Sequence, residues 1–228
     1  SEKISGCIVG EPTNVNQIGD TIKIGRRGSF TGSLTVKGVQ GHVGYPDLAE
    51  NPINSLLKML EPFSKIYLDK GTNEFQPSSV MVTTIDVNND ASNVIPGEVK
   101  AKFNIRFNTL HSVASLQSML KNQFDAITKN YEFDYFCNAE PFLTSDEELK
   151  STLQNAITKV VNVNPEKSTT GGTSDARFIT KLCPVIEFGL VGKTMHKIDE
   201  NVEVEDIMKL TNIYNKFLHN YFRVEKND

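Results

Sequence analysis

The feature that most constrains the fold is a series of periodic apolar patterns across residues 28–137. Apolar side chains alternate over 30–36, recur at helical spacing over 53–63, and alternate again over 80–87 and 99–107. A second helical pattern over 113–127 and an alternating segment over 131–137 complete the series. Period two is typical of strands and period 3.6 of helices. The order β-α-β-β-α-β predicts a ferredoxin-like α+β fold, with a four-stranded antiparallel sheet covered by two helices.

The segments on either side of this region are interpreted as two pieces of one α/β domain. Residues 4–9 form a short apolar strand that ends at Gly10-Glu11-Pro12, where proline leaves regular pairing. A helix over 149–160 follows Ser145 and Glu148, whose spacing is that of a capping box. A buried strand at 184–188 and a long helix at 204–221 come next. The sequence therefore predicts divisions at 1–27, 28–140 and 141–228, with the middle region inserted into an α/β domain.

Composition and charge exclude several classes of function. The chain has 228 residues, 38% of them hydrophobic, which is enough for ordinary globular cores. A net charge of -4, with no Lys/Arg block, provides no electrostatic footprint for nucleic acid or an anionic membrane. No apolar run approaches the roughly 20 residues that span a bilayer, and residues 1–4 begin no signal peptide.

The cysteines indicate a reducing environment. Cys7, Cys137 and Cys183 are odd in number, widely spaced and set in apolar segments. This arrangement favours reduced thiols over a disulfide framework or a thiolate zinc site. We therefore expect a cytoplasmic location.

Two residues in loops after apolar strands have the chemistry of metal ligands. Glu11 follows the strand at 4–9, and His196 follows the strand at 184–188, near Asp199 and Glu200. Carboxylate and imidazole groups are the ligands that hydrolytic zinc sites use. A solvated turn carboxylate and a surface histidine are the ordinary alternatives, because such residues are mostly exposed. The two residues alone leave the choice open.

Seven short motifs favour the metal-ligand interpretation of Glu11 and His196, through the family that their order and spacing resemble. They occupy residues 9–13 (VGEPT), 24–29 (IGRRGS), 38–46 (GVQGHVGYP), 93–97 (NVIPG), 103–107 (FNIRF), 171–178 (GGTSDARF) and 194–197 (TMHK). Together they resemble the later motifs of the dinuclear zinc amidohydrolases of the M20 peptidase family, most closely its desuccinylase branch. The resemblance implies that 1–27 and 141–228 belong to a catalytic domain and that 28–140 is a dimerisation or lid domain.

The resemblance also implies roles for individual residues. Glu11 would ligate one metal and His196 the other. His42 would act in the active site of the dimer partner, where it polarises the scissile amide and stabilises the oxyanion. Asn93 would reach towards the substrate in the partner subunit, and Tyr45 is a further substrate contact, although a tyrosine beside proline is as often a packing residue.

The remaining motif residues are interpreted as grips for a substrate with several carboxylates. Arg26 and Arg106 carry the planar fork that binds carboxylates in a bidentate manner; an ordinary salt bridge is the alternative. Gly172, Thr173 and Ser174 lie in a flexible loop that could receive an anion on its N–H groups and hydroxyls. The alternative for this loop is a simple turn before a helix, with Thr173 or Ser174 as N-cap, and both interpretations can hold.

The family's earlier motifs have no counterpart in this chain. They supply the other zinc ligands and a general base, and the Glu147-Glu148 pair does not replace them because it lies at a helix start. One ligand per metal cannot hold a zinc pair. We therefore expect a C-terminal portion of an enzyme that binds two zinc ions per subunit when complete, with cobalt as a substitute, and weak or no metal binding and no activity in this chain alone.

The function implied for the complete enzyme is hydrolysis of N-succinyl-LL-2,6-diaminopimelate to succinate and LL-2,6-diaminopimelate, in lysine and cell-wall synthesis, by a homodimer. One alternative is a sister deacylase such as acetylornithine deacetylase, or an M20 peptidase. A non-enzyme alternative is an isolated dimerisation or interaction module. An RNA-binding module of the same topology is disfavoured, because residues 103–107 lack the basic, glycine-rich pattern and the net charge is negative.

Overall fold

The structure, a computed structural model, describes residues 3–223. The chain forms two compact units. The inserted unit is Arg27–Pro141, and the flanking unit combines Ser1–Arg26 with Phe142–Asp228. These boundaries differ by one residue from the divisions expected from the sequence.

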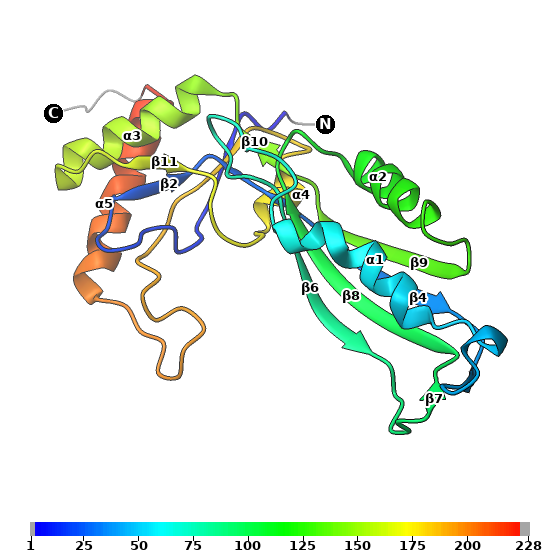
Figure 1. Cartoon of the computed structure of the whole chain (residues 1–228). Helices are drawn as coiled ribbons and strands as arrows, with labels where there is room; N and C mark the ends of the chain where they lie inside the picture. Colours follow the sequence, from blue (N-terminus) through cyan, green and yellow to red (C-terminus); the bar gives the residue numbers. More distant parts are fainter. Residues whose placement is uncertain (1–2, 224–228) are drawn as a thin grey trace, which may run out of the picture. The chain divides into compact units, whose positions relative to one another are not determined.

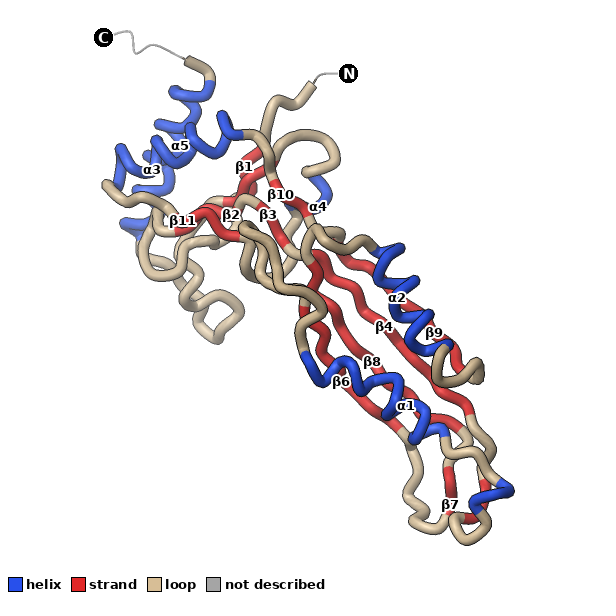
Figure 2. The backbone as a smooth tube through the Cα atoms, turned by 45° about the horizontal axis from the view of Figure 1, so that its top comes forward, coloured by secondary structure: helices blue, strands red, loops and turns tan. Residues whose placement is uncertain are grey.

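The inserted unit has the β-α-β-β-α-β order that periodicity predicts, so this expectation is confirmed. Its main elements are β4 (Gly28–Lys37), α1 (Pro52–Leu60), β6 (Ser79–Asp86), β8 (Glu98–Phe107), α2 (Val113–Asp125) and β9 (Tyr131–Ala139). The strands form an antiparallel sheet in the order β6-β8-β4-β9. Helices α1 and α2 cover the same face of this sheet (Figures 1 and 2).

The core of the inserted unit lies between that sheet face and the two helices. Alternate residues of β8 point inward and are almost fully buried: Val99, Ala101, Phe103, Ile105 and Phe107. They pack against apolar residues of both helices within one hydrophobic cluster. Burying each large apolar side chain contributes roughly 1.5–3 kcal/mol, so this alternation is the main stabilising feature of the unit.

The first helix of the inserted unit is shorter than its apolar pattern. The α-helix ends at Leu60, and the chain continues as the 3-10 helix η2 (Glu61–Lys65). Pro62 explains the change, because proline has no N–H for a helical bond and its ring clashes with the preceding turn. Beyond β4 the chain forms the small pair β5 (Gly41–His42) and β7 (Val94–Ile95), and the short 3-10 helix η1 (Pro46–Leu48).

The flanking unit contains a mixed sheet of short strands in the order β1-β12-β2-β11. These strands are β1 (Cys7–Val9), β2 (Thr21–Lys23), β11 (Glu166–Ser168) and β12 (Val185–Glu187). A second pair joins β3 (Gly25–Arg26) to β10 (Phe142–Leu143). The helices are α3 (Glu147–Val161), α4 (Ala176–Ile179) and α5 (Val204–Tyr221). Apolar side chains of α3, α5 and the sheet form one core.

The expected capping box at the start of α3 is wrong. The N-cap is Asp146, whose carboxylate accepts the N–H of Leu149 at 2.8 Å. Ser145 lies one residue too early for this role. The reciprocal bond of a capping box needs a side-chain acceptor at the third helical position, and leucine has none.

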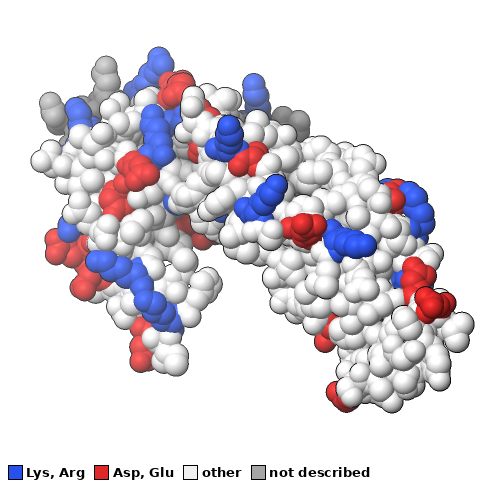
Figure 3. Space-filling view, in the orientation of Figure 1, with Lys and Arg blue, Asp and Glu red and all other residues white. Residues whose placement is uncertain are grey.

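The described residues add three further observations, on the cysteines, on membrane-spanning helices and on surface charge. Cys7, Cys137 and Cys183 are free thiols, and burial raises the pKa of each. No helix within residues 3–223 is long and apolar enough to cross a membrane. Basic and acidic side chains are interspersed on the face that Figure 3 shows.

Candidate active site

A cavity of about 430 Å³ in the flanking unit gathers most of the residues that the motifs single out there. Its walls come from residues 11–15, the 171–173 loop and the 192–196 loop, together with Lys23 and Arg26. The predicted residues Glu11, Arg26, Gly172, Thr173 and His196 all line it.

Sheet topology explains why Glu11 and His196 share one cavity. β1 runs parallel to β12, so the segments that leave their carboxyl ends emerge at the same edge of the sheet. Asn14 joins the two segments: its side-chain amide donates to the Gly189 carbonyl at 2.6 Å, and its backbone carbonyl accepts the Gly192 N–H at 3.0 Å. The two candidate metal ligands are therefore brought together by backbone pairing.

The loop that carries His196 has an unusual backbone. His196 has φ of 61° and Asp199 has φ of 58°, the left-handed region that residues other than glycine rarely adopt. The His196 N–H donates to a Glu200 carboxylate oxygen at 3.2 Å. Such conformations cost about 1–3 kcal/mol each and concentrate at functional sites. The imidazole is left exposed at the cavity wall.

Glu187, beside this cavity, is one of two residues that the sequence analysis missed. It is fully buried on β12 and accepts Arg26 Nε with both oxygens, at 3.1 and 3.0 Å. Arg26 Nη2 and the Ser174 hydroxyl also donate to it. Charged residues are rarely buried unless paired, so a glutamate inside the apolar 184–188 segment was the available signal.

The bonds to Glu187 bear on whether Arg26 and Ser174 can contact a substrate. Arg26 Nη1 donates to the Thr170 carbonyl at 3.0 Å, so the guanidinium is held on two sides. One N–H on each terminal nitrogen stays free, because the group has five donors. Ser174 is buried and does not line the cavity. Direct substrate contact by Arg26 and Ser174 therefore remains a prediction, whereas their bonds to Glu187 are observed.

Lys23 is a further cationic residue of the cavity wall, and the sequence analysis did not select it. Its ammonium donates to the Ser168 hydroxyl at 3.0 Å and the Thr170 hydroxyl at 2.8 Å. Burial lowers the Lys23 pKa, and the nearby Arg26 charge lowers it further. The cavity wall therefore carries three basic side chains, Lys23, Arg26 and Lys193, beside the buried Glu187 carboxylate, which suits an anionic ligand.

The 171–174 loop packs closely against Arg26. Gly171 has φ of 103°, a conformation that favours glycine. A Cβ there would also collide with the Arg26 guanidinium. Gly172 is open, with nothing within 4 Å of where a Cβ would lie. Thr173 accepts Arg177 Nη1 at 3.0 Å. The alternative of Thr173 or Ser174 as N-cap is wrong, because the N-cap position of α4 is Asp175, without a side-chain bond.

Three predicted residues of the inserted unit lie together at the β5/β7 end. The His42 and Tyr45 rings are 5.6 Å apart between centroids, and the Asn93 carbonyl accepts the Val43 N–H at 3.1 Å. His42 Nδ1 accepts the Gly44 N–H at 2.9 Å. The neutral ring therefore carries its proton on Nε2, which is the arrangement needed to donate to an oxyanion. All three side chains are exposed.

Arg106 lies at the opposite end of the same unit. It is opposite Ser29 and Ser79 in the sheet, near the last residue of β8. β8 has 10 residues and a strand rises about 3.3 Å per residue, so roughly 30 Å separates this end from the β5/β7 end. Arg106 and His42 of one chain cannot contact the same small molecule.

The residues present do not by themselves fit a zinc centre. Within residues 3–223, no group of three or more His, Cys, Asp or Glu side chains is close enough to hold a metal ion. The cavity offers one carboxylate, Glu11, and one imidazole, His196. A structural or catalytic zinc site needs at least three protein ligands.

Comparison with solved structures shows which proteins share this fold. The M20 family metallo-carboxypeptidase Sso-CP2 from Sulfolobus solfataricus matches with a TM-score of 0.74 at 17% identity, over 96% of this chain and 64% of that chain. Aminopeptidase PepT from Bacillus cereus matches with a TM-score of 0.75 at 16% identity, over 92% of this chain and 56% of that one. At such identities the likeness concerns the fold. Residues 24–132 also match the peptidase dimerisation domain of the M20 type. Residues 24–132 therefore belong to the M20 dimerisation-domain family.

Within that family the chain is similar to succinyl-diaminopimelate desuccinylases. It is 52% identical over 225 residues to the enzyme of that name from Pelagibacter ubique, and 50% identical over 226 residues to that from Parvibaculum lavamentivorans. The matches cover 97% of this chain but only 59% and 57% of the relatives. The chain therefore spans somewhat more than half the length of the curated relatives that it matches.

Proposed function

We propose that this chain is part of an enzyme that hydrolyses N-succinyl-LL-2,6-diaminopimelate to succinate and LL-2,6-diaminopimelate. The observation that carries the proposal is the cavity in which Glu11, His196 and Arg26 meet the 171–173 loop, in a chain 52% identical to a desuccinylase. The pathway would be lysine and diaminopimelate biosynthesis, and the location the cytoplasm.

The cavity suits a substrate that carries several carboxylates. Lys23 and Arg26 place positive charge on its wall, and the free N–H groups of the Arg26 fork can donate to an anion. Gly172 leaves space for a ligand to approach the backbone closely. Arg106, in the inserted unit, is proposed as a second carboxylate grip.

Glu11 and His196 would each ligate one of two zinc ions, or cobalt ions in their place, with the other ligands and the general base supplied from outside this chain. Bound zinc lowers the pKa of water and polarises a carbonyl. The residues of this chain would anchor the carboxylates, orient the amide and donate to the oxyanion.

The inserted unit would join two chains into a homodimer and so bring His42 to the partner's site. Roughly 30 Å separates the His42 end of the inserted unit from the Arg106 end of β8. This distance supports a dimer in which His42 and Arg106 at one site come from different chains, because one unit cannot offer both residues to one substrate. Tyr45 and Asn93 would reach the partner's substrate together with His42. Residues 28–140 would then be the dimerisation domain, and 1–27 with 141–228 part of the catalytic domain.

A substrate panel tests the proposal. This chain would be fused to the portion of the Pelagibacter ubique relative that lies outside the match, loaded with zinc, and assayed with N-succinyl-LL-2,6-diaminopimelate, N-acetylornithine and dipeptides. We expect kcat/KM to be highest for the succinyl substrate. A preference for acetylornithine or a dipeptide would assign the chain to a sister M20 activity instead. A dimer with no turnover of any substrate would favour an interaction module.

A further inference from the structure

Arg27 lies beside Arg106 at one end of the inserted unit. Arg27 immediately precedes β4, whose Ser29 is opposite Arg106 in the sheet. On β8, Ile105 and Phe107 point into the core, so Arg106 between them lies on the opposite face of the sheet. Burial lowers the Arg27 pKa, and the nearby Arg106 charge lowers it further. Like charges repel, so two neighbouring arginines favour a carboxylate close to both.

One nitrogen of Arg27 has no partner among residues 3–223. Its Nε is buried and has no acceptor there. Buried donors are nearly always satisfied, so this N–H marks a place where an acceptor is expected. Arg27 Nη1 donates to the Pro77 carbonyl at 3.0 Å. Because the guanidinium is planar and rigid, the position of that carbonyl determines the direction of the Nε–H.

Pro77 is held on both sides by a hydrogen-bonded cluster centred on Asp69. The Asn108 amide donates to the Gln76 carbonyl at 3.2 Å, and the Ser78 N–H donates to Asp69, also at 3.2 Å. The Asn108 amide donates to Asp69 as well, at 2.9 Å. Ser78 and Asn108 are fully buried, so water does not compete for these bonds. The residues on either side of Pro77 are therefore fixed by the cluster.

His111 completes this Asp69 cluster from the loop before α2. Its Nε2 lies 3.1 Å from the Asp69 carboxylate, and the two side chains are only 19% and 12% exposed. The Gly71 N–H also donates to Asp69, at 2.6 Å. The Asp69 charge reaches Arg27 too, since it opposes the lowering of the Arg27 pKa. Asp69 therefore acts on Arg27 both directly, by charge, and through the loop that carries Pro77.

We propose that the Asp69 cluster, with Asn108 and His111, positions Arg27 so that its free Nε–H faces the carboxylate that Arg106 grips. Asp69 itself contacts no substrate, so it is a positioning residue. The inference rests on the proposed function and deepens it. A carboxylate is not the group that reacts, so its grip strengthens binding of the substrate and of the transition state alike. Disturbing the cluster should therefore raise KM and leave kcat almost unchanged.

Steady-state kinetics of the completed enzyme test the proposal. Asp69→Asn should raise KM for the succinyl substrate about tenfold and keep kcat within about twofold, because a displaced guanidinium binds the carboxylate less well. The control Asp134→Asn, the same change at an exposed residue of the inserted unit, should alter neither constant. In an Arg27→Gln background Asp69→Asn should raise KM no further, because the side chain through which it acts is absent. His111→Ala should raise KM by a smaller factor, and His111→Gln, whose amide can donate to Asp69, should restore it.

Hydrogen exchange in this chain alone separates the positioning role from the proposed function. The buried Arg27 Nε–H, assigned by its loss in Arg27→Gln, should exchange slowly in nitrogen-15 spectra. Asp69→Asn should speed that exchange about tenfold, by loosening the loop that holds the guanidinium. If Asp69→Asn does not fold, His111→Ala replaces it in both measurements.

Three results would overturn the proposal. These are an Arg27 exchange rate unchanged in the folded variant, a KM that does not rise, and an equal rise of KM in the Arg27→Gln background. If the exchange rate changes as expected while no succinyl substrate is turned over, the proposed function fails and the positioning of Arg27 stands.

Discussion

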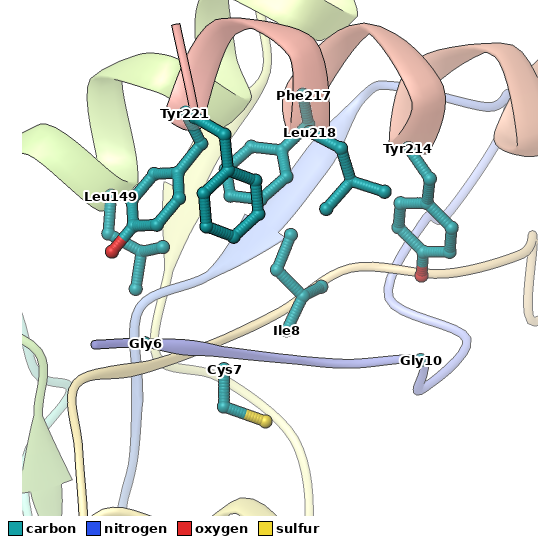
Figure 4. A pocket seen from close by; sticks show the side chains of 10 residues that line it. Gly6, Cys7, Ile8, Gly10, Leu149, Tyr214, Phe217, Leu218 and Tyr221 are labelled. Carbon is teal, nitrogen blue, oxygen red and sulfur yellow. The ribbon is translucent and has the colours of Figure 1, made fainter. Parts of the chain in front are cut away.

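The two units differ in how their cores are closed. The inserted unit is one continuous segment whose long strands and two helices enclose a single core. The flanking unit is assembled from two segments, and contacts such as Asn14 to Gly189 join residues 175 positions apart. Its sheet strands have three residues each, and the outer strand β1 is only partly buried, with Ile8 directed towards α5 (Figure 4). Long, regular strand pairing closes a core within one continuous segment, whereas the candidate site is built where short strands from two separate segments meet.

The largest expected effect is a loss of catalysis, because the flanking unit alone has too few metal ligands. The chain alone should hydrolyse no N-succinyl-LL-2,6-diaminopimelate and should bind zinc only weakly, because Glu11 and His196 are too few ligands for two metals. Calorimetric zinc titration and a hydrolysis assay measure both. Tight binding of two zinc ions, or turnover well above background, would contradict it.

The second prediction concerns the buried Arg26–Glu187 ion pair of the flanking unit. Glu187→Ala should lower its free energy of unfolding by about 3–5 kcal/mol, because an uncompensated Arg26 charge stays buried. Denaturant unfolding followed by hydrogen exchange should show the inserted unit unchanged. As a control, the double variant Arg26→Met/Glu187→Leu should be less destabilised than Glu187→Ala, because no lone charge remains. Equal destabilisation of both units would show that they do not unfold separately.

The third prediction concerns the role of His42, in the inserted unit, in catalysis. In the enzyme completed as above, His42→Ala should lower kcat by about 10²–10³, the scale for losing one oxyanion donor, while zinc content stays the same. Mixing it with His196→Ala should restore partial activity, because heterodimers contain one site with intact metal ligands and a His42 from the partner. If mixed dimers form and no activity returns, His42 does not act across the interface.

The smallest expected effect is a pH dependence in the inserted unit. Asp69 accepts the Gly71 N–H at 2.6 Å, the Asn108 amide at 2.9 Å and His111 Nε2 at 3.1 Å, and also accepts the Ser78 N–H. Burial alone would raise the Asp69 pKa, but the hydrogen bonds from Ser78, Gly71 and Asn108 outweigh it and lower the pKa below its ordinary value.

Because its folded pKa is depressed, Asp69 stabilises the unit fully above the unfolded pKa of about 3.9, and this stabilisation is lost as pH falls through the folded value. Asp69→Asn should cost about 1–3 kcal/mol at neutral pH and flatten the acid dependence below about pH 4. Urea unfolding between pH 3 and 7, with the exposed Asp134→Asn as control, measures both effects. An acid profile identical to wild type would exclude Asp69 as the responsible group.

Prediction from sequence succeeded where an element is long enough to show its period. The terminal helix expected at 204–221 is α5 (Val204–Tyr221), and the alternation expected over 99–107 is β8. The strands β2, β3, β10 and β11 were not predicted, because two or three residues are too few to establish alternation. The equally short β1 and β12 were predicted only because each lies in a continuous apolar run. Their pairing is decided by partners far along the chain.

The sequence by itself determined the order of elements in the inserted unit, the family, and the motifs that carry Glu11, His42 and His196. Only the tertiary structure decided that Arg26 is held by Glu187, that Lys23 lines the cavity, and that His42 and Arg106 lie at opposite ends of the inserted unit. The physical reason is that periodicity records which side of an element is apolar, whereas the partner of a buried charge depends on which distant strands pair.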